Sequence, residues 1–186
     1  MKRHVITISG NIASGKSEVS KRLADSLSYE LYKASEEFRR QARENNMTLV
    51  EFNEYLENRP ELDIYVDNCT SEYVKDKSDI VVDARLAFYF VKEAFDVFLK
   101  ADTKVAAKRL FQAAVSRGKE EEYSSEEEAK EGIVRREQAE KIRYFERYGI
   151  DITDMDNYTC VIDTTDMTSE QVTEKILEEY NKWLKD

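Results

Sequence analysis

Histidine and cysteine are scarce in this chain, and their scarcity excludes several kinds of chemistry. The 186 residues include one histidine, His4, and two cysteines, Cys69 and Cys160. A zinc cluster needs several such ligands at short spacing, and a Ser-His-Asp arrangement would have to use His4 as its base. The cysteines lie far apart in sequence without metal-ligand spacing, so we expect reduced thiols in a cytoplasmic protein.

Long apolar runs and an excess of positive charge are missing too. The apolar run near the N-terminus, Val5 to Ile8, is too short for a signal peptide or a membrane span. Acidic residues outnumber basic ones by 39 to 29, which argues against a nonspecific nucleic-acid binder. We therefore expect a cytoplasmic monomer without membrane or nucleic-acid partners.

Glycine is also scarce, with five residues, but two of the five fall in one loop. The segment Gly10 to Ser17 (GNIASGKS) fits G-x-x-x-x-G-K-[ST] in full, between an apolar strand pattern and a helical one. Backbone N–H groups of such a loop converge on phosphate oxygens, and the following helix points its positive end at them. The expected ATP-binding residues are Gly10, Asn11, Ile12, Ala13, Ser14, Gly15, Lys16 and Ser17.

Two side chains of this phosphate loop have chemical roles of their own. Lys16 supplies a mobile cation for the β- and γ-phosphates, and Ser17 offers a hydroxyl to Mg²⁺. The motif therefore predicts ATP with Mg²⁺, whereas the molecule that accepts the phosphoryl group is not determined by it.

Five apolar strand patterns, each followed by a helical pattern, predict an α/β fold with a mostly parallel sheet covered on both faces. The strands are expected at His4–Ser9, Tyr29–Tyr32, Asp79–Asp83, Phe95–Leu99 and Thr159–Asp163. Helices are expected at Lys16–Leu27, Ser35–Glu44, Thr48–Leu56, from Pro60, at Thr103–Arg117, from Ser124 to about Tyr148 and at Thr168–Leu184. Without an internal repeat or a linker, residues 1–186 are predicted to form a single domain.

Arginines gather in the second half of the chain, where they are suited to clamping phosphates. They are Arg109, Arg117, Arg135, Arg136 and Arg143. Arg136 and Arg143 are seven residues apart in a predicted helix, about two turns, and so share one face. The alternative is that these arginines pair with neighbouring glutamates on a solvated face.

Several further segments carry a family resemblance. They are Phe38-Arg39, Met47–Phe52, Pro60–Asp63 with Asp67, Arg85–Ala87, Arg136–Tyr144, Tyr148–Asp151 and Val161–Thr164. Together with the phosphate loop they resemble, in register over nearly the whole chain, the archaeal-type cytidylate kinases of the nucleoside monophosphate kinase group. The resemblance implies a P-loop kinase fold with five parallel strands in the order 2-3-1-4-5, a monophosphate-binding insert at about 33–77 and a mobile lid at about 109–145.

The same resemblance implies roles for individual residues. Arg39 and Arg85 would hold the acceptor phosphate, and Asp63 and Asp67 would face the acceptor's base or ribose. The alternative for the two aspartates is a plain helix surface. The lid arginines would be Arg109, Arg136 and Arg143, of which Arg136 and Arg143 would act with Lys16 on the transferring phosphoryl group. Asp83 would order Mg²⁺ through water, or else simply cap the end of its strand.

The reaction expected from these residues is phosphoryl transfer from ATP to CMP or dCMP, giving CDP or dCDP. A monophosphate has a second pKa of ~6 and needs no general base, in keeping with the lack of histidine. The chain departs from the family pattern at Ala34-Ser35 and Ala84, which touch the expected acceptor pocket. Alternatives therefore stay open: another nucleoside monophosphate, shikimate, gluconate or dephospho-coenzyme A as acceptor, or a non-catalytic nucleotide-binding protein.

Overall fold

The computed structural model describes residues 3–48, 51–52, 55, 59–117 and 123–185. Its strands are β1 (Val5–Gly10), β2 (Glu30–Lys33), β3 (Ile80–Asp83), β4 (Phe95–Lys100) and β5 (Cys160–Asp163). Its α-helices are α1 (Lys16–Leu27), α2 (Ala34–Glu44), α4 (Pro60–Val74), α5 (Ala87–Phe90), α6 (Thr103–Arg117), α7 (Glu126–Tyr148) and α8 (Ser169–Trp183). A 3₁₀ turn, η1 (Met155–Asn157), precedes β5.

The five strands form one parallel sheet in the order β2-β3-β1-β4-β5, which confirms the predicted fold class and strand order. β1 is central, and all six of its residues are buried, as expected for a strand covered on both faces. Because the strands are parallel, their carboxyl ends share one edge of the sheet, where the loops that carry function meet.

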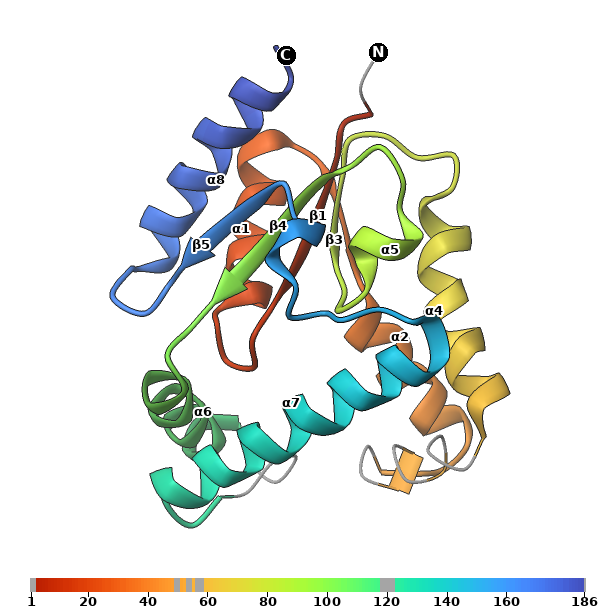
Figure 1. The fold of residues 1–186 in the computed structure, drawn as a ribbon, viewed down its shortest axis with the longest axis vertical. Helices are drawn as coiled ribbons and strands as arrows, with labels where there is room; N and C mark the ends of the chain where they lie inside the picture. Colours follow the sequence, from red (N-terminus) through yellow and green to blue (C-terminus); the bar gives the residue numbers. More distant parts are fainter. Residues whose placement is uncertain (1–2, 49–50, 53–54, 56–58, 118–122, 186) are drawn as a thin grey trace.

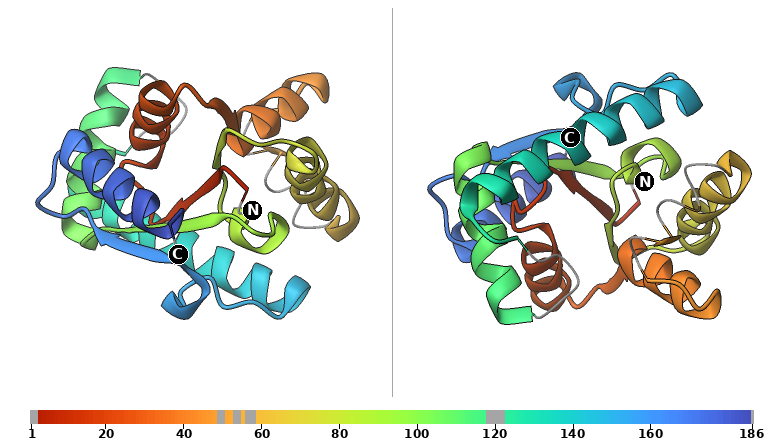
Figure 2. Two further views of the ribbon diagram at one scale, coloured as in Figure 1. Left: turned by 90° about the horizontal axis from the view of Figure 1, so that it is seen from above. Right: turned by 90° about the horizontal axis from the view of Figure 1, so that it is seen from below.

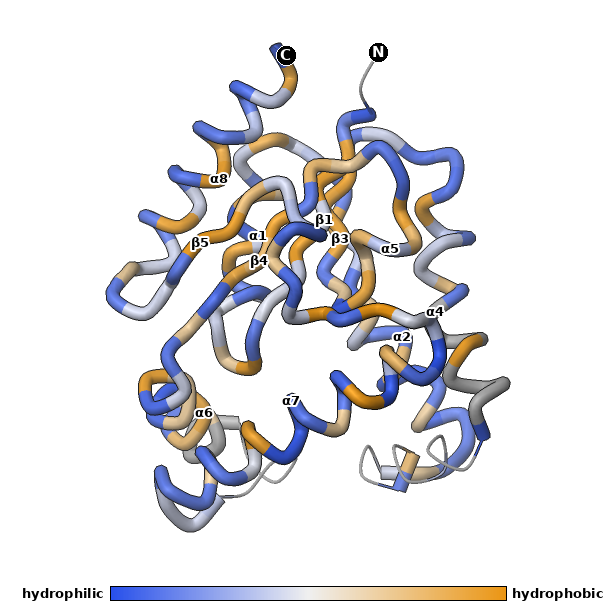
Figure 3. Tube along the Cα trace, in the orientation of Figure 1, coloured by the Kyte–Doolittle hydropathy of each residue, from blue (hydrophilic) through white to orange (hydrophobic). Residues whose placement is uncertain are grey.

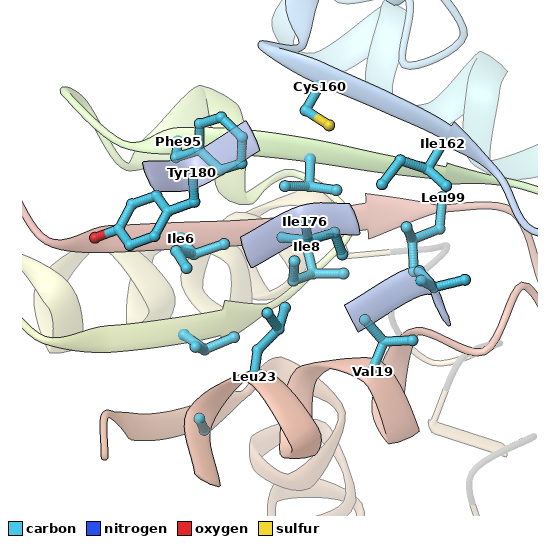
Figure 4. Close-up of a cluster of buried hydrophobic side chains, with 14 residues drawn as sticks. Ile6, Ile8, Val19, Leu23, Phe95, Leu99, Cys160, Ile162, Ile176 and Tyr180 are labelled. Carbon is cyan, nitrogen blue, oxygen red and sulfur yellow. The ribbon is translucent and has the colours of Figure 1, made fainter. Parts of the chain in front are cut away.

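Helices cover both faces of the sheet (Figure 2). On one face, α1 and α8 pack on a cluster that includes Ile6, Ile8, Leu23, Ile176 and Tyr180 (Figure 4). The other face packs on α4 and α5 through a second cluster that includes Val5, Val74, Val82 and Ala87. Hydrophobic residues accordingly follow the strands, whereas the outer sides of the helices are hydrophilic (Figure 3).

Two short elements were not predicted, and one predicted helix lies mostly outside the described residues. The single-turn α5 and the turn η1 contain too few residues to show a helical period. Of the helix expected at Thr48–Leu56, the capping box is observed: the Thr48 N–H donates to Glu51 and the Glu51 N–H donates to the Thr48 hydroxyl.

The arrangement places the phosphate loop and the chain ends at opposite ends of the molecule. α7 crosses the carboxyl edge of the sheet, running from α6 towards α2 (Figure 1). The start of β1 and the end of α8 lie near each other at the amino edge of the sheet, opposite the phosphate loop (Figure 1).

Among the described helices, none combines the length and apolar character that crossing a membrane requires. Cys69 and Cys160 are both free thiols.

Candidate active site

The phosphate loop joins the end of β1 to the start of α1, and both of its glycines have a positive φ, a conformation that favours glycine. Gly10 has a φ of 147°, and a Cβ there would collide with the backbone of Leu99 in β4. Gly15 has a φ of 91° and caps the amino end of α1. The loop thus turns sharply against β4 and aims the positive end of α1 outward, as anion binding requires.

Lys16 lies across this loop. Its Nζ donates to the carbonyl oxygens of Gly10 and Asn11, both at 3.1 Å. Burial of the ammonium lowers the pKa of Lys16 to about 7, and the positive charge of Arg85 adds to this effect, while Asp83 acts in the opposite direction. Phosphate oxygens would favour the charged form of Lys16.

A pair of oxygen ligands lies beside Lys16. The Ser17 hydroxyl donates to Asp83 Oδ2 at 3.1 Å, and Asp83, at the end of β3, is only 7% exposed. Mg²⁺ is usually held by one or two protein oxygens together with phosphates and water, and a hydroxyl beside a carboxylate fits that ion. No cluster of three or more His, Cys, Asp or Glu suited to a metal occurs among the described residues.

A cavity of about 580 Å³ opens beside the phosphate loop, within the usual range for small-molecule sites. Among its lining residues, basic side chains outnumber acidic ones by six to three, in a protein with a net charge of −10. The predicted site residues that line it are Ile12, Ala13, Ser14, Gly15, Lys16, Ser17, Arg39, Asp83, Arg85, Arg109, Arg136 and Arg143. Residues distant in sequence are thus brought to one anion-attracting cavity.

Four further predicted site residues belong to the phosphate loop itself or to α4. Gly10 and Asn11 begin the loop on the side that faces β4, where the Asn11 N–H donates to Leu99 O at 2.9 Å. Asp63 and Asp67 belong to α4, but their side chains lie outside the described residues, as does that of Arg117 in α6.

Arg85 connects the phosphate loop to α7. One of its Nη atoms donates to Gly10 O, and its Nε forms an ion pair with Glu140 at 3.2 Å. A guanidinium has five N–H donors, so Arg85 keeps the capacity to bind a phosphate in the cavity. Further along α7, Arg143 donates to the Tyr144 hydroxyl at 3.1 Å and lies over that ring.

Arg109 is tied to the loop after β5. Its Nη2 donates to the carbonyl oxygens of Thr164 at 2.8 Å and Thr165 at 3.1 Å. The Thr164 hydroxyl in turn donates to Ser14 O at 3.1 Å. Arg109 therefore borders the cavity from a fixed position, next to the phosphate loop.

The sequence prediction missed two acidic residues of the site, Glu137 and Glu140. Glu137 Oε1 accepts from Asn11 Nδ2 and from the Ile12 N–H, each at 3.0 Å. Both glutamates belong to the quoted motif, and Arg136, Glu140 and Arg143 recur at the spacing of one helix face. That spacing was the available signal, but it does not identify the partners across the fold.

A parallel sheet with a phosphate loop and a basic cavity at its carboxyl edge defines a P-loop nucleotide-binding fold. Comparison with known proteins agrees. Residues 5–166 match the cytidylate kinase-like family, and the chain belongs to that family. A cytidylate kinase of Methanosarcina mazei is 37% identical over 162 residues, covering 86% of each chain.

Two other relatives extend this comparison. An S-adenosylmethionine-dependent nucleotide dehydratase of Lacinutrix mariniflava is 36% identical over 178 residues, covering 95% of this chain, and this chain spans only 36% of that protein's length. A solved shikimate kinase of Acinetobacter baumannii has a TM-score of 0.63 and 14% identity, covering 97% of this chain and 94% of that one. At that identity the likeness concerns the fold alone.

Proposed function

We propose that this protein transfers the γ-phosphoryl group of ATP to CMP or dCMP, giving CDP or dCDP. The observation that carries the proposal is the single cavity in which the phosphate loop faces Arg39, Arg85, Arg136 and Arg143. Such a cavity can hold two anions, a donor triphosphate and an acceptor phosphate, next to each other. Relatives that are named cytidylate kinase support CMP as the acceptor.

The donor phosphates would be bound by residues 10–17, with Lys16 on the β- and γ-phosphates. Ser17 and Asp83 would hold Mg²⁺, which when bound neutralises charge on the phosphates. Arg109, anchored to the loop after β5, would border the donor from the lid.

The acceptor would lie between Arg39 of α2 and Arg85 after β3, with its phosphate on both guanidinium groups. Asp63 and Asp67 would face its base or ribose, a role that rests on the family motif. A carboxylate is a suitable partner for the amino group of cytosine.

The chemical step needs positioning and charge neutralisation more than proton transfer. The acceptor phosphate is mostly ionised near neutral pH, since its second pKa is ~6, so an oxygen can attack directly. Lys16, Arg136 and Arg143 would stabilise the charge on the transferring group. We propose that 33–77 is the acceptor segment and 109–145 a lid whose closure excludes water, within one monomeric, cytoplasmic domain.

An acceptor screen tests this proposal. ADP release is measured with ATP and Mg²⁺ against CMP, dCMP, UMP, AMP, GMP, shikimate, gluconate and dephospho-coenzyme A. We expect kcat/KM for CMP or dCMP to exceed that for every hydroxyl acceptor by ~100-fold or more, because a hydroxyl needs a general base that a phosphate does not.

Two controls define failure of the proposal. Lys16→Ala should abolish transfer to every acceptor, and activity that survived this change would refute the phosphate-loop assignment. ATP binding without transfer to any acceptor would instead indicate a non-catalytic nucleotide-binding protein.

A further inference from the structure

Successive turns of α7 are connected to the phosphate loop, either directly or through Arg85. Ile133 shares an apolar cluster with Ile12. One turn further, Glu137 accepts from Asn11 and Ile12. At the next turn, Glu140 pairs with Arg85, which also donates to Gly10 O. Of these contacts, only that of Glu137 joins a charged group of α7 directly to the loop.

Both bonds of Glu137 end on the same oxygen, Oε1, and both donors belong to the first half of the loop. One donor is the Ile12 backbone N–H, which fixes the course of the main chain. The other is Asn11 Nδ2. The Oδ1 atom of the same side chain accepts from the Ala101 N–H at 3.2 Å. The Asn11 side chain therefore connects the end of β4 to α7, and Glu137 is its partner on α7.

The placement of a glutamate here has an electrostatic cost that calls for an explanation. A second anion near a phosphate site disfavours phosphate binding by Coulomb repulsion. The carboxylate offsets that cost through two hydrogen bonds to the loop, which are of the charge-assisted and therefore stronger kind. Glu137 directly follows Arg136 and lies six residues, or about 1.7 turns, before Arg143. A contact at Glu137 therefore bears on how the helix presents both cavity-lining arginines.

We infer that Glu137 is a positioning residue, which couples α7 to the phosphate loop and so holds Arg136 and Arg143 in register with the donor phosphates. This role rests on the phosphoryl transfer proposed above. Glu137 touches the loop rather than the reacting atoms, so it acts through Asn11, Ile12 and the two arginines.

Four forms of the enzyme separate this role from others: wild type, Glu137→Ala, Glu137→Gln and Glu146→Ala. Glu137→Gln keeps an oxygen at the position that accepts both bonds, but removes the charge. Glu146 is an exposed glutamate of the same helix and serves as the matched control. Thermal melting shows whether each variant is folded.

For Glu137→Ala we expect kcat with CMP to fall ~10- to 100-fold, the effect of losing hydrogen bonds to a charged group. KM for CMP should stay within ~3-fold, because the acceptor residues Arg39 and Arg85 are retained. Glu137→Gln should remain within ~3-fold of wild type in every parameter. Its amide oxygen accepts the same bonds, and loss of the charge removes the repulsion of phosphate together with the charge assistance. Glu146→Ala should also remain within ~3-fold of wild type, because that side chain is exposed.

A double-mutant cycle with Asn11→Ala gives a second measurement. Adding Glu137→Ala to Asn11→Ala should reduce kcat less than Glu137→Ala does alone, because part of the contact is already lost. If Glu137→Ala proved unfolded, Glu137→Gln and Asn11→Ala would still report on the contact: the first should be active, and the second impaired in kcat.

Two results would overturn the inference. Either Glu137→Ala has wild-type kcat, or Glu137→Gln is as impaired as Glu137→Ala, which would mean that the charge and not the hydrogen bonds matters. In both cases a wild type that phosphorylates CMP leaves the proposed function intact.

Failure of the proposed function can also be distinguished from failure of the inference about Glu137. If the wild type phosphorylated no acceptor, the proposed function would fail, and titration with ATP alone would still test Glu137. Glu137→Ala should then raise the Kd for ATP ~10-fold, whereas Glu137→Gln should match wild type. An unchanged Kd for Glu137→Ala would reject the coupling.

Discussion

At the residue scale, Lys16 has a pKa that the site lowers and that bound phosphates would raise. Its ammonium is directed back at two carbonyl oxygens of the loop, and burial lowers its pKa to about 7. The neutral form is thus favoured in the folded protein relative to the unfolded chain. Between about 7 and the usual lysine value of 10.5, the unfolded chain binds more protons than the folded protein. Stability therefore rises with pH through that window, as the cost of burying the charge of Lys16 disappears.

The depressed pKa of Lys16 predicts proton uptake on ATP binding. Phosphate oxygens favour the ammonium, so at pH 8 a nearly neutral lysine should take up close to ~1 proton per ATP bound. Calorimetric titration in two buffers of different ionisation enthalpy measures this uptake. The exposed Lys21 of α1 offers a control, since Lys21→Met should keep the uptake. A wild type without uptake at pH 8 contradicts the expectation.

Arg39 and Arg40 are neighbours with different surroundings, which allows a matched test of the acceptor site. Both are exposed, but Arg39 lines the cavity, whereas Arg40 pairs with Glu37 and Glu44 on its own helix. We expect Arg39→Ala to raise KM for CMP ~10- to 100-fold through loss of a charged hydrogen bond, with kcat within ~3-fold. Arg40→Ala should leave both constants at wild-type values. Equal effects of the two changes in steady-state kinetics would remove Arg39 from the acceptor site.

At the scale of elements, the bounds of strands and helices were largely predictable, because each has a local signal. Lys16–Leu27 and Thr103–Arg117 were predicted to the residue, and α7 begins after the Ser125 cap that its acidic first turn indicates. The contacts that build the site were not predictable in the same way. Glu137 lies 126 residues from Asn11, and Arg109 lies 55 from Thr164, and no local pattern specifies such pairs.

The two glycines at the ends of β1 and α7 should respond differently to the same substitution. A Cβ on Gly10 would collide with Leu99 backbone atoms, whereas Gly149, with a φ of 67°, has open space around it. Gly149→Ala should therefore cost only the left-handed backbone penalty of ~1–2 kcal/mol. Gly10→Ala adds a clash that the sheet cannot relieve, so it should cost ~4 kcal/mol or more.

Urea unfolding of both glycine variants measures these costs. Gly10→Ala should also lose ATP binding, because the phosphate loop would be displaced from β4. A Gly10→Ala protein as stable as Gly149→Ala would contradict the close approach of the loop to Leu99.

At the scale of the whole molecule, stability should depend on pH through one carboxyl group in the sheet. Asp96 of β4 lies opposite Thr7 of β1 and accepts from its hydroxyl at 2.5 Å. Burial raises the pKa of Asp96 to about 6, and the bond from Thr7 only partly opposes this. The folded protein therefore binds this proton more tightly than the unfolded chain, and stability is lost as pH rises from about 4 through about 6.

Asp96→Asn should remove that loss. An amide oxygen still accepts from Thr7, so the variant should equal or exceed wild type in stability at pH 7.5, by at most ~3 kcal/mol. Unfolding in urea at intervals from pH 4.5 to 7.5 measures the difference. The pKa shift of Asp151 has the opposite sign: Thr153 and Lys141 lower it to about 2. Its contribution is lost only below about pH 4, so it does not affect the profile in this range. A wild type and Asp96→Asn with parallel pH profiles would contradict the assignment.

The start of β1 and the end of α8 lie at the amino edge of the sheet, away from the cavity at the carboxyl edge (Figure 1). If the protein were anchored to a surface or fused to another protein by either end, its cavity would thus stay accessible to nucleotides from solution. Because the start of β1 and the end of α8 lie near each other, this fold is a candidate for circular permutation. A short peptide could join them without crossing the cavity.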